Sequence, residues 1–252
     1  MAGKTTGLGD NLYVQGRNLS GDIQALGRIG GGPALLDMTS IVKYAMERQG
    51  GLRDGAIEAT SFFNPDSGAS HETFSAAPTS DIIVTYCRGT TLGNPAACLN
   101  GKQANYDPTR GNDGSLTASV NAQGNGFGLE WCEQLTAGVR TDSAAANGGS
   151  VDFAAGTNFG LQAYLHVFDF TGTDVTVKLQ QSSDNGGADA WADVTGGAFT
   201  AITGGAPSAQ RIQTARNLAV ERYLRVVTAT TGGFSNLAFA VSVAKNPVEV
   251  LF

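Results

Sequence analysis

The chain has 252 residues, enough for one large or two ordinary domains, each with a buried core. Charged residues make up only 15% of it, and its 35 glycines are about twice the usual share of ~7%. This composition predicts many turns and little long helix. A surface so poor in charge also indicates that other subunits cover much of it.

Charge and cysteine usage exclude several classes of protein. Residues 1–145 hold 10 basic and 14 acidic side chains, a net charge of −4, and residues 146–252 hold 6 and 8, a net charge of −2. Neither half carries the basic patch that a nucleic-acid-binding protein needs. Cys87, Cys98 and Cys132 are odd in number and form no Cys-x-x-Cys pair, which argues against a disulfide framework or a zinc site. They predict small core residues in a protein that matures in a reducing cytoplasm.

The N-terminal stretch contains no apolar run typical of a signal peptide, and no segment approaches the ~20 apolar residues of a membrane span. We therefore expect a soluble chain that is not exported by a signal peptide. Residues 1–33 are rich in glycine and asparagine, with only short apolar pieces such as Leu12, Tyr13 and Val14. This pattern predicts an extended N-terminal arm, with a strand or two, that finds its partners on another molecule.

A short strand followed by a short helix is predicted next. Residues 35–38 are apolar enough for a strand, and Thr39 or Ser40 could cap a helix over residues 41–48. Ile41, Tyr44, Ala45 and Arg48 would share one face of that helix. Gly50 and Gly51 would end it.

The hydrophobic period then changes from 3.6 to 2, which indicates β-structure. Strands are predicted over GAIEATSFF (55–63), DIIVTYCRG (81–89), NDGSLTASV (112–120) and GFGLEWCEQL (126–135). The Asp113-Gly114 pair suits a tight hairpin turn. The first half is therefore predicted to be mainly antiparallel β with one short helix, and to form a domain over residues 34–142.

Residues 143–150 are small and polar, so we expect a linker there and a second domain over 151–252. Six strands are predicted in that second domain, separated by glycine-rich turns: 159–170, 175–182, 198–203, 210–215, 220–230 and 237–246. Six strands in about a hundred residues are typical of a β-sandwich, here of jelly-roll type.

Motifs for catalysis and cofactors are weak. His71 and His166 are the two histidines, neither lies in a metal-binding spacing, and no Gly-x-Ser-x-Gly elbow occurs. The sequence GRIGGG (27–32) lacks the spacing of a dinucleotide-binding loop. We therefore expect no enzyme, no catalytic residues and no cofactor.

Two binding sites remain possible in the second half. Asp184, Asp189 and Asp193 could hold a calcium ion, although their spacing matches no known calcium loop and turn-capping is the plainer interpretation. Trp191 and Tyr223 could contact a glycan, but a packed core tryptophan explains Trp191 as well. No metal site is predicted.

The segment LLDMTSIVKYAMERQGGLRDGAIEATSFFNP (35–65) resembles the major tail proteins that form the tail tube of long-tailed bacteriophages. Flanking pieces resemble that family too, including YVQGRNLSGDIQALGRI upstream and LTAGVRTD downstream. The resemblance covers residues 11 to about 142 and is strongest to tail proteins of phages that infect actinobacteria.

The resemblance implies a tail-tube-type β-sandwich or barrel with one short helix. Copies would close into a ring, usually of six subunits, and rings would stack into a hollow tube for DNA ejection, with the N-terminal arm and a long loop bridging rings. Candidate residues for ring or stack contacts are Tyr13, Ile23, Arg53, Asp54, Gly55, Phe62 and Phe63. Gly55 is expected to need a backbone conformation barred to branched residues. The C-terminal sandwich is expected on the outside of the tube.

A duct that lets DNA pass should have neutral or acidic walls, because each phosphate neutralised by Lys or Arg tightens binding. Candidate lumen-facing acids are Asp54, Glu58, Asp81, Asp113 and Glu130. Expected partners are copies of the chain itself, the tape-measure, tail-tip and tail-terminator proteins, and passing genomic DNA without tight binding, with no membrane. The protein would reside in the virion tail after assembly in the host cytoplasm. The alternatives are another virion protein, such as a capsid decoration or minor tail protein, and a glycan-binding β-sandwich module.

Overall fold

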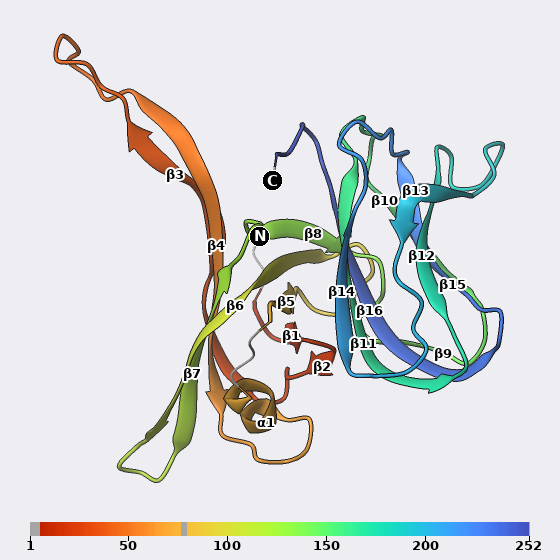
Figure 1. Ribbon diagram of the computed structural model, residues 1–252, viewed down its shortest axis with the longest axis horizontal. Helices are drawn as coiled ribbons and strands as arrows, with labels where there is room; N and C mark the ends of the chain where they lie inside the picture. The colour runs from red at the N-terminus through yellow and green to blue at the C-terminus, as the bar shows by residue number, and fades with distance from the viewer. Residues whose placement is uncertain (1–5, 77–79, 252) are drawn as a thin grey trace.

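The computed structural model describes residues 6–76 and 80–251 (Figure 1). The fold is mainly β, as predicted, with antiparallel strand pairs and one short helix. The first half contains β1 (Asn11–Val14), β2 (Arg17–Asn18), β3 (Ile23–Asp37), β4 (Arg48–Phe62), α1 (Ser70–Ser75), β5 (Ile82–Cys87), β6 (Pro95–Arg110), β7 (Leu116–Gly124), β8 (Glu130–Gln134) and β9 (Arg140–Asp142). The second half contains β10 (Asn147–Asp152), β11 (Leu161–Gly172), β12 (Thr176–Ser182), β13 (Ala192–Ala198), β14 (Ser208–Gln213), β15 (Tyr223–Ala229) and β16 (Phe234–Lys245).

The strands form one large and one small sheet. The 12-stranded sheet follows the order β14-β11-β16-β8-β6-β5-β1-β2, with β3, β4 and β7 branching from β6 and β9 pairing with β16. The small sheet has the order β10-β15-β12-β13. Strands from both sides of the predicted 143–150 linker therefore share the large sheet, and residues 147–150 of that linker belong to β10. The division into two domains stays a prediction.

Three apolar cores hold the strands together. One lies between β11, β14 and β16 of the large sheet and the small sheet, and it forms the predicted C-terminal β-sandwich. A second lies inside the curled first half, where β1, β5, β6, β7 and β4 pack against one another and against α1. The third joins the two halves, with Tyr13 and Cys98 packed against Tyr164 and Ala240.

The N-terminal arm prediction is wrong for residues 11–14. Strand β1 pairs with β5 in its own chain, and Leu12, Tyr13 and Val14 are 3%, 1% and 2% exposed. Leu12 and Val14 enter the core of the first half, whereas Tyr13 points into the joining core. Both faces of this short strand are covered, which explains why three apolar residues suffice to anchor it. Residues 1–5 of the predicted arm lie outside the described residues.

The helix predicted over residues 41–48 is also wrong, because this segment is the tip of the β3–β4 hairpin. The tip is closed by backbone bonds from Met38 N–H to the Glu47 carbonyl at 2.9 Å and from Lys43 N–H to the Ser40 carbonyl at 3.1 Å. Ile41 and Tyr44 are fully exposed. A short helix needs a surface on which to bury its apolar face, and this segment has none in the chain.

The one helix, α1, was not predicted. It begins after Ala69 and places Phe74, which is 2% exposed, in the core of the first half. The strand predicted over 198–203 is displaced, since β13 ends at Ala198 and only Ile202 makes an isolated bridge, with Val175. Strands β6 and β9 were missed.

Candidate functional site

A four-stranded sheet in the first half has two open edges. The order β3-β4-β7-β6 is antiparallel throughout. Strand β3 pairs with β4 alone, and residues 102–110 of β6 pair with β7 alone among the described strands. Pro33 and Pro108 lie in these two outer strands, where a missing N–H costs no ladder bond. Open strand edges are templates for pairing with another chain.

A row of glycines crosses all four of these strands. Gly31 pairs with Gly55, and Gly101 pairs with Gly124. Gly55 and Gly124 continue the β4–β7 register one step beyond Ala56 and Gln123. A Cβ atom on any of the four would lie 2.0–2.7 Å from a backbone atom of a neighbouring segment. At Gly55 and Gly124 the sheet lies against residues 127–129, which connect β7 to β8. Strand β7 ends at Gly124.

The two faces of the sheet differ in chemistry. Ile57 and Ala59 of β4 and their partners Ala122 and Val120 of β7 face the apolar core. The opposite face consists of side chains in register across the strands, mostly hydroxyls and amides, with few charges and one aromatic ring: Glu58, Thr60, Phe62, Lys102, Asn105, Asp107, Thr109, Thr117, Ser119, Asn121 and Gln123. This polar face is at least partly solvent-exposed, so it can line an aqueous space.

Beyond the glycine row, β3 and β4 continue as a two-stranded arm that projects from the body (Figure 1). With the exception of Thr39 and Gly51, every residue from 31 to 54 is exposed. The arm carries large apolar side chains that nothing in the described chain covers: Leu35, Leu36, Met38, Ile41, Val42, Tyr44, Met46 and Leu52. An apolar surface of this kind on a water-exposed arm marks a protein interaction site.

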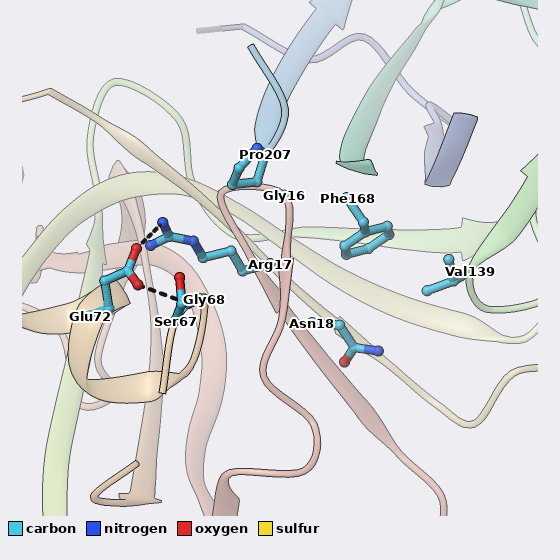
Figure 2. Close-up of a pocket in the computed structure, with 9 residues that line it drawn as sticks. All are labelled: Gly16, Arg17, Asn18, Ser67, Gly68, Glu72, Val139, Phe168 and Pro207. Atoms are coloured by element: carbon cyan, nitrogen blue, oxygen red, sulfur yellow. Dashed lines mark hydrogen bonds and ion pairs between the residues drawn. The ribbon is translucent and has the colours of Figure 1, made fainter. Parts of the chain in front are cut away.

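A second surface feature is a mixed pocket of about 460 Å³ beside β2 and α1, away from the arm tip (Figures 1 and 2). Arg17 Nη2 lies 2.7 Å from Glu72 Oε1, and the Gly68 N–H donates to the other carboxylate oxygen at 2.8 Å. The Gly68 N–H bond, with Arg17 as a further cause, lowers the pKa of Glu72. Phe168 and Val139 form the apolar wall. The Ser67 side chain also bonds to Glu72, so the carboxylate is held by donors from Gly68, Ser67 and Arg17.

The two halves of the chain are joined by buried polar contacts. Arg211 Nη2 lies 2.9 Å from Glu130 Oε1, and the Tyr164 hydroxyl donates to the other oxygen of Glu130. The ring of Phe127 covers the Arg211 guanidinium at 3.8 Å. Burial raises the pKa of Tyr164 well above its ordinary value. Because β8 supplies Glu130 and β14 supplies Arg211, this cluster ties the C-terminal sandwich to the first half.

His166 forms the second buried connection. Its Nδ1 accepts a bond from the Gly16 N–H at 3.1 Å, and its Nε2 lies 2.9 Å from Thr85 Oγ1. Burial lowers the pKa of His166 to about 3, so the ring is neutral and holds the β1–β2 turn against β11. A Cβ atom on Gly16 would lie 2.4 Å from backbone atoms of Val167 and Ser208, which shows how closely this turn is docked.

The predicted assembly residues are dispersed. Arg53 and Asp54 are exposed on the arm, Phe62 is 46% exposed at the end of β4, and Ile23 is half-buried at the start of β3. Phe63 is partly buried, with its ring 4.5 Å from that of His71. Tyr13 is buried within the chain and is removed from the set of contact residues.

Gly55 is required for a different reason from the one expected. Its backbone has no positive φ, so branched residues are not barred by conformation. A Cβ atom there would lie 2.5 Å from Leu129 N and 2.6 Å from Leu129 Cβ. The need for glycine is therefore one of space inside the chain.

Only part of the predicted acidic set shares a surface. Glu58 lies on the polar face of the sheet. Asp54 precedes it by four residues on β4, so it lies on the same side of the strand. Asp81 is paired with Lys102 Nζ at 2.7 Å, and Asp113 lies in the β6–β7 turn, where it accepts bonds from Ser115. The prediction for Glu130 is wrong, because this residue is 5% exposed and paired with Arg211 inside the chain.

The predicted glycan and calcium residues lie near the outer side of the small sheet. Trp191 is half-buried, with Arg225 stacked on its ring at 4.4 Å, and Tyr223 is packed beside Arg222. Asp184 accepts backbone N–H bonds from Gly187, Ala188 and Asp189, and the Ala188 bond is the main cause that lowers the pKa of Asp184. Asp193 is instead bound to Lys178 and Gln180.

No group of three or more His, Cys, Asp and Glu side chains in residues 6–76 and 80–251 could hold a metal ion. Within those ranges, no helix has the length and apolar character to cross a bilayer. Cys87, Cys98 and Cys132 are buried free thiols, and burial raises the pKa of Cys132.

No family model matches the sequence, and no curated protein matches it. Among solved structures, the chain is similar to the Dit protein of phage SPP1, described as a paradigm of the hub adsorption apparatus in phages that infect Gram-positive bacteria. That similarity has 11% identity and a TM-score of 0.33, and it covers 93% of this chain and 98% of that chain.

The baseplate of phage p2 in its activated conformation with Sr gives 10% identity and a TM-score of 0.33, with 96% and 99% covered. A structure of infectious bursal disease virus, strain Gx, gives 12% identity and a TM-score of 0.22, with 94% and 56% covered. Similarity at this level does not define what the chain does.

Proposed function

We propose that the chain is a non-enzymatic structural subunit of a bacteriophage tail, of the tail-tube type, which assembles with copies of itself into rings. The observation that carries this proposal is the four-stranded antiparallel sheet with both outer edges open. The sequence resemblance over residues 11 to about 142 supports the same assignment.

The topology favours a closed ring because the sheet contains an even number of alternating strands. Strands β3 and β6 therefore run in opposite directions. A rotation about an axis parallel to the strands preserves their directions, so β3 of one copy meets β6 of the next in antiparallel orientation. Such a heterologous contact closes when the rotation divides a full turn, and a closed barrel has no open edge. Rings of six copies, as the resemblance implies, would satisfy this condition.

The polar face of the sheet would then line the channel. Its hydroxyl and amide side chains, with Glu58 among them, present no cluster of Lys or Arg to DNA. Few phosphate contacts mean little counterion release and little retention of the passing genome. On the other side, the C-terminal sandwich packs against the surface of β5, β6 and β8 that faces away from the core of the first half, which supports a position outside the tube.

The arm supplies the remaining contact of the assembly. Its apolar tip lies beyond the end of β7, so it would project past the ring toward an adjoining ring or toward tape-measure, tail-tip or terminator proteins (Figure 1). The protein would then reside in the virion tail after assembly in the bacterial cytoplasm.

Amide hydrogen exchange combined with negative-stain electron microscopy tests the proposal. Rings or tubes should form as the protein concentration rises, and residues 23–32 and 102–107 should gain protection together on assembly while β4 and β7 stay unchanged. Monomers at all concentrations, or rings without protection of these two edges, would contradict the proposed contact.

A proline variant sharpens the same test. Gln24 is exposed and has no partner in the β3–β4 register, so Gln24→Pro should block the outer edge of β3 with little effect on the β3–β4 ladder. Ala144→Pro, in the exposed bend between β9 and β10, is the matched control because it lies on neither sheet edge nor on the arm. Rings from Gln24→Pro as abundant as those from the control would count against edge pairing.

A further inference from the structure

A groove of about 810 Å³ separates the base of the arm from the C-terminal segment. One wall is formed by Pro33 and residues 50–53 of the arm, and the facing wall by residues 248–251. Gly124 and residues 126–128, next to the glycine row, form the floor. The floor therefore has three glycines beside one aromatic ring, and each wall is mainly apolar with one charged residue, Arg53 or Glu249.

Strand β4 has an unfilled position beside this groove. Between Ala56 and Phe62 it pairs with β3 on one side and β7 on the other. Strand β7 ends at Gly124, whereas β4 extends to Arg48. Over residues 48–54, β4 thus has β3 on one side and no strand of the described chain on the other, although Gly128 lies against residues 53 and 54. The vacant position continues the line of β7 along residues 48–52 and is ~15 Å long.

The C-terminal segment has the properties of a strand that could occupy this position. It leaves the sandwich at Asn246, whose N–H donates to the Gly160 carbonyl at 3.1 Å and whose Nδ2 donates to the Phe159 carbonyl at 2.9 Å. Residues 247–251 that follow belong to no strand. Val248 and Leu251 are 62% and 65% exposed.

Composition and position both favour pairing within one chain. Val248, Val250 and Leu251 are good strand formers, and Glu249 lies across the groove from Arg53, which has the opposite charge. The segment runs from the end of the sandwich toward the arm, so it already stands opposite β4 of the same chain (Figure 1). A segment from another copy would first have to displace it.

We propose that residues 247–251 add to β4 of their own chain as a further strand and close the groove. Closure covers Leu52, which is 89% exposed, with Val248, which shares a face of the added strand with Val250. It also gives hydrogen-bond partners to the outer edge of β4 over residues 48–52. The added strand links the arm to the C-terminal sandwich and restricts the angle at which the arm leaves the body. This inference goes beyond the proposed function and does not depend on ring formation.

A disulfide-trapping experiment on the full-length monomer tests the inference. The double variant Leu52→Cys/Val250→Cys, kept dilute and oxidised mildly, should form an intramolecular disulfide in most molecules, detected as a monomer that has lost two hydrogen atoms in its intact mass. The native cysteines are buried and do not compete. Leu35→Cys/Val250→Cys is the control, because Leu35 is also exposed, at 67%, but lies on β3.

The outcomes are distinct. A disulfide-linked dimer as the main product would overturn pairing within one chain and assign the position to a second copy. Equal trapping in the Leu35 control would show a mobile tail without a defined site, and no trapping would also overturn the proposal.

Truncation after Asn246 provides an independent readout in the same monomer. Amide exchange over residues 48–52 should accelerate at least about tenfold, while residues 56–62, which pair with β7, should not change. Unchanged exchange over 48–52 would contradict strand addition. Since both measurements use monomers, they can succeed or fail whatever happens to ring assembly.

Discussion

The glycine row makes a sharp prediction about the stability of the isolated subunit. Replacing Gly55 by alanine adds a Cβ atom 2.5 Å from Leu129 N and 2.6 Å from Leu129 Cβ, and both distances are below any ordinary contact. The obstacle is backbone as well as side chain, so it cannot rotate away. Overpacking of a core by one carbon costs about 1–3 kcal/mol. For a chain of this size, that loss lowers the melting temperature by about 2–12 °C.

Gly50→Ala is the matched control on the same strand. Its Cβ atom would lie 3.5 Å from Pro33 Cβ, an ordinary contact on an exposed strand. Removing a glycine from the unfolded ensemble there should stabilise the chain by about 0.4–1 kcal/mol. The two variants should therefore move the free energy of unfolding in opposite directions, as measured by urea titration followed by circular dichroism. A Gly55→Ala variant as stable as the parent would refute the close approach of Leu129 to β4.

Three further predictions concern other parts of the chain. Ile41→Ser and Tyr44→Ser should change the free energy of unfolding by less than ~0.5 kcal/mol, since both side chains are fully exposed, yet shorten or abolish tubes seen by electron microscopy. His166 has its pKa lowered to about 3 by burial, against ~6.5 when unfolded, so the unfolded state binds more protons between these values and stability falls as pH decreases, by up to ~1.4 kcal/mol per pH unit. Urea titrations at about pH 6 and pH 4 should show a shallower decrease in His166→Gln, and an equal decrease would exclude this group as a cause. Glu130→Gln should cost about 3–5 kcal/mol because it leaves the buried Arg211 without its counter-charge, whereas replacing both residues by apolar ones should cost less, and equal losses in a double-mutant cycle would show that the pair is not coupled.

The local alternation of apolar and polar residues was sufficient to predict most of the strands. The alternation of apolar and polar residues in 55–63, 81–89 and 175–182 depends on one face being buried and the other not, which is a property of the segment itself. The turn clusters that separate the strands are also local, since glycine and Asp-Gly pairs set the backbone without help from distant residues. The all-β class and the C-terminal sandwich followed from these signals.

The predictions that needed knowledge of a partner surface were the ones that were wrong. The spacing of Ile41, Tyr44 and Ala45 is helical, but no apolar surface of the chain receives that face, so the segment forms a hairpin tip. Conversely, Leu12 to Val14 were too short to suggest a core strand, and they are buried because β5 and the second half cover both faces. Glu130 was predicted to be an exposed acid. Its burial depends on Arg211, which lies 81 residues away in the sequence.

The sequence by itself determined the β class, the low share of charged residues, the turn positions and the resemblance to tail-tube proteins. Each of these depends on residues close together along the chain or on simple totals. Only the tertiary structure decided which strand edges are open, which face of the sheet is polar, and that Gly31, Gly55, Gly124 and Gly101 form one row. The physical reason is that an edge, a face and a row are relations between strands, and strand register depends on pairing between segments that are far apart in the chain.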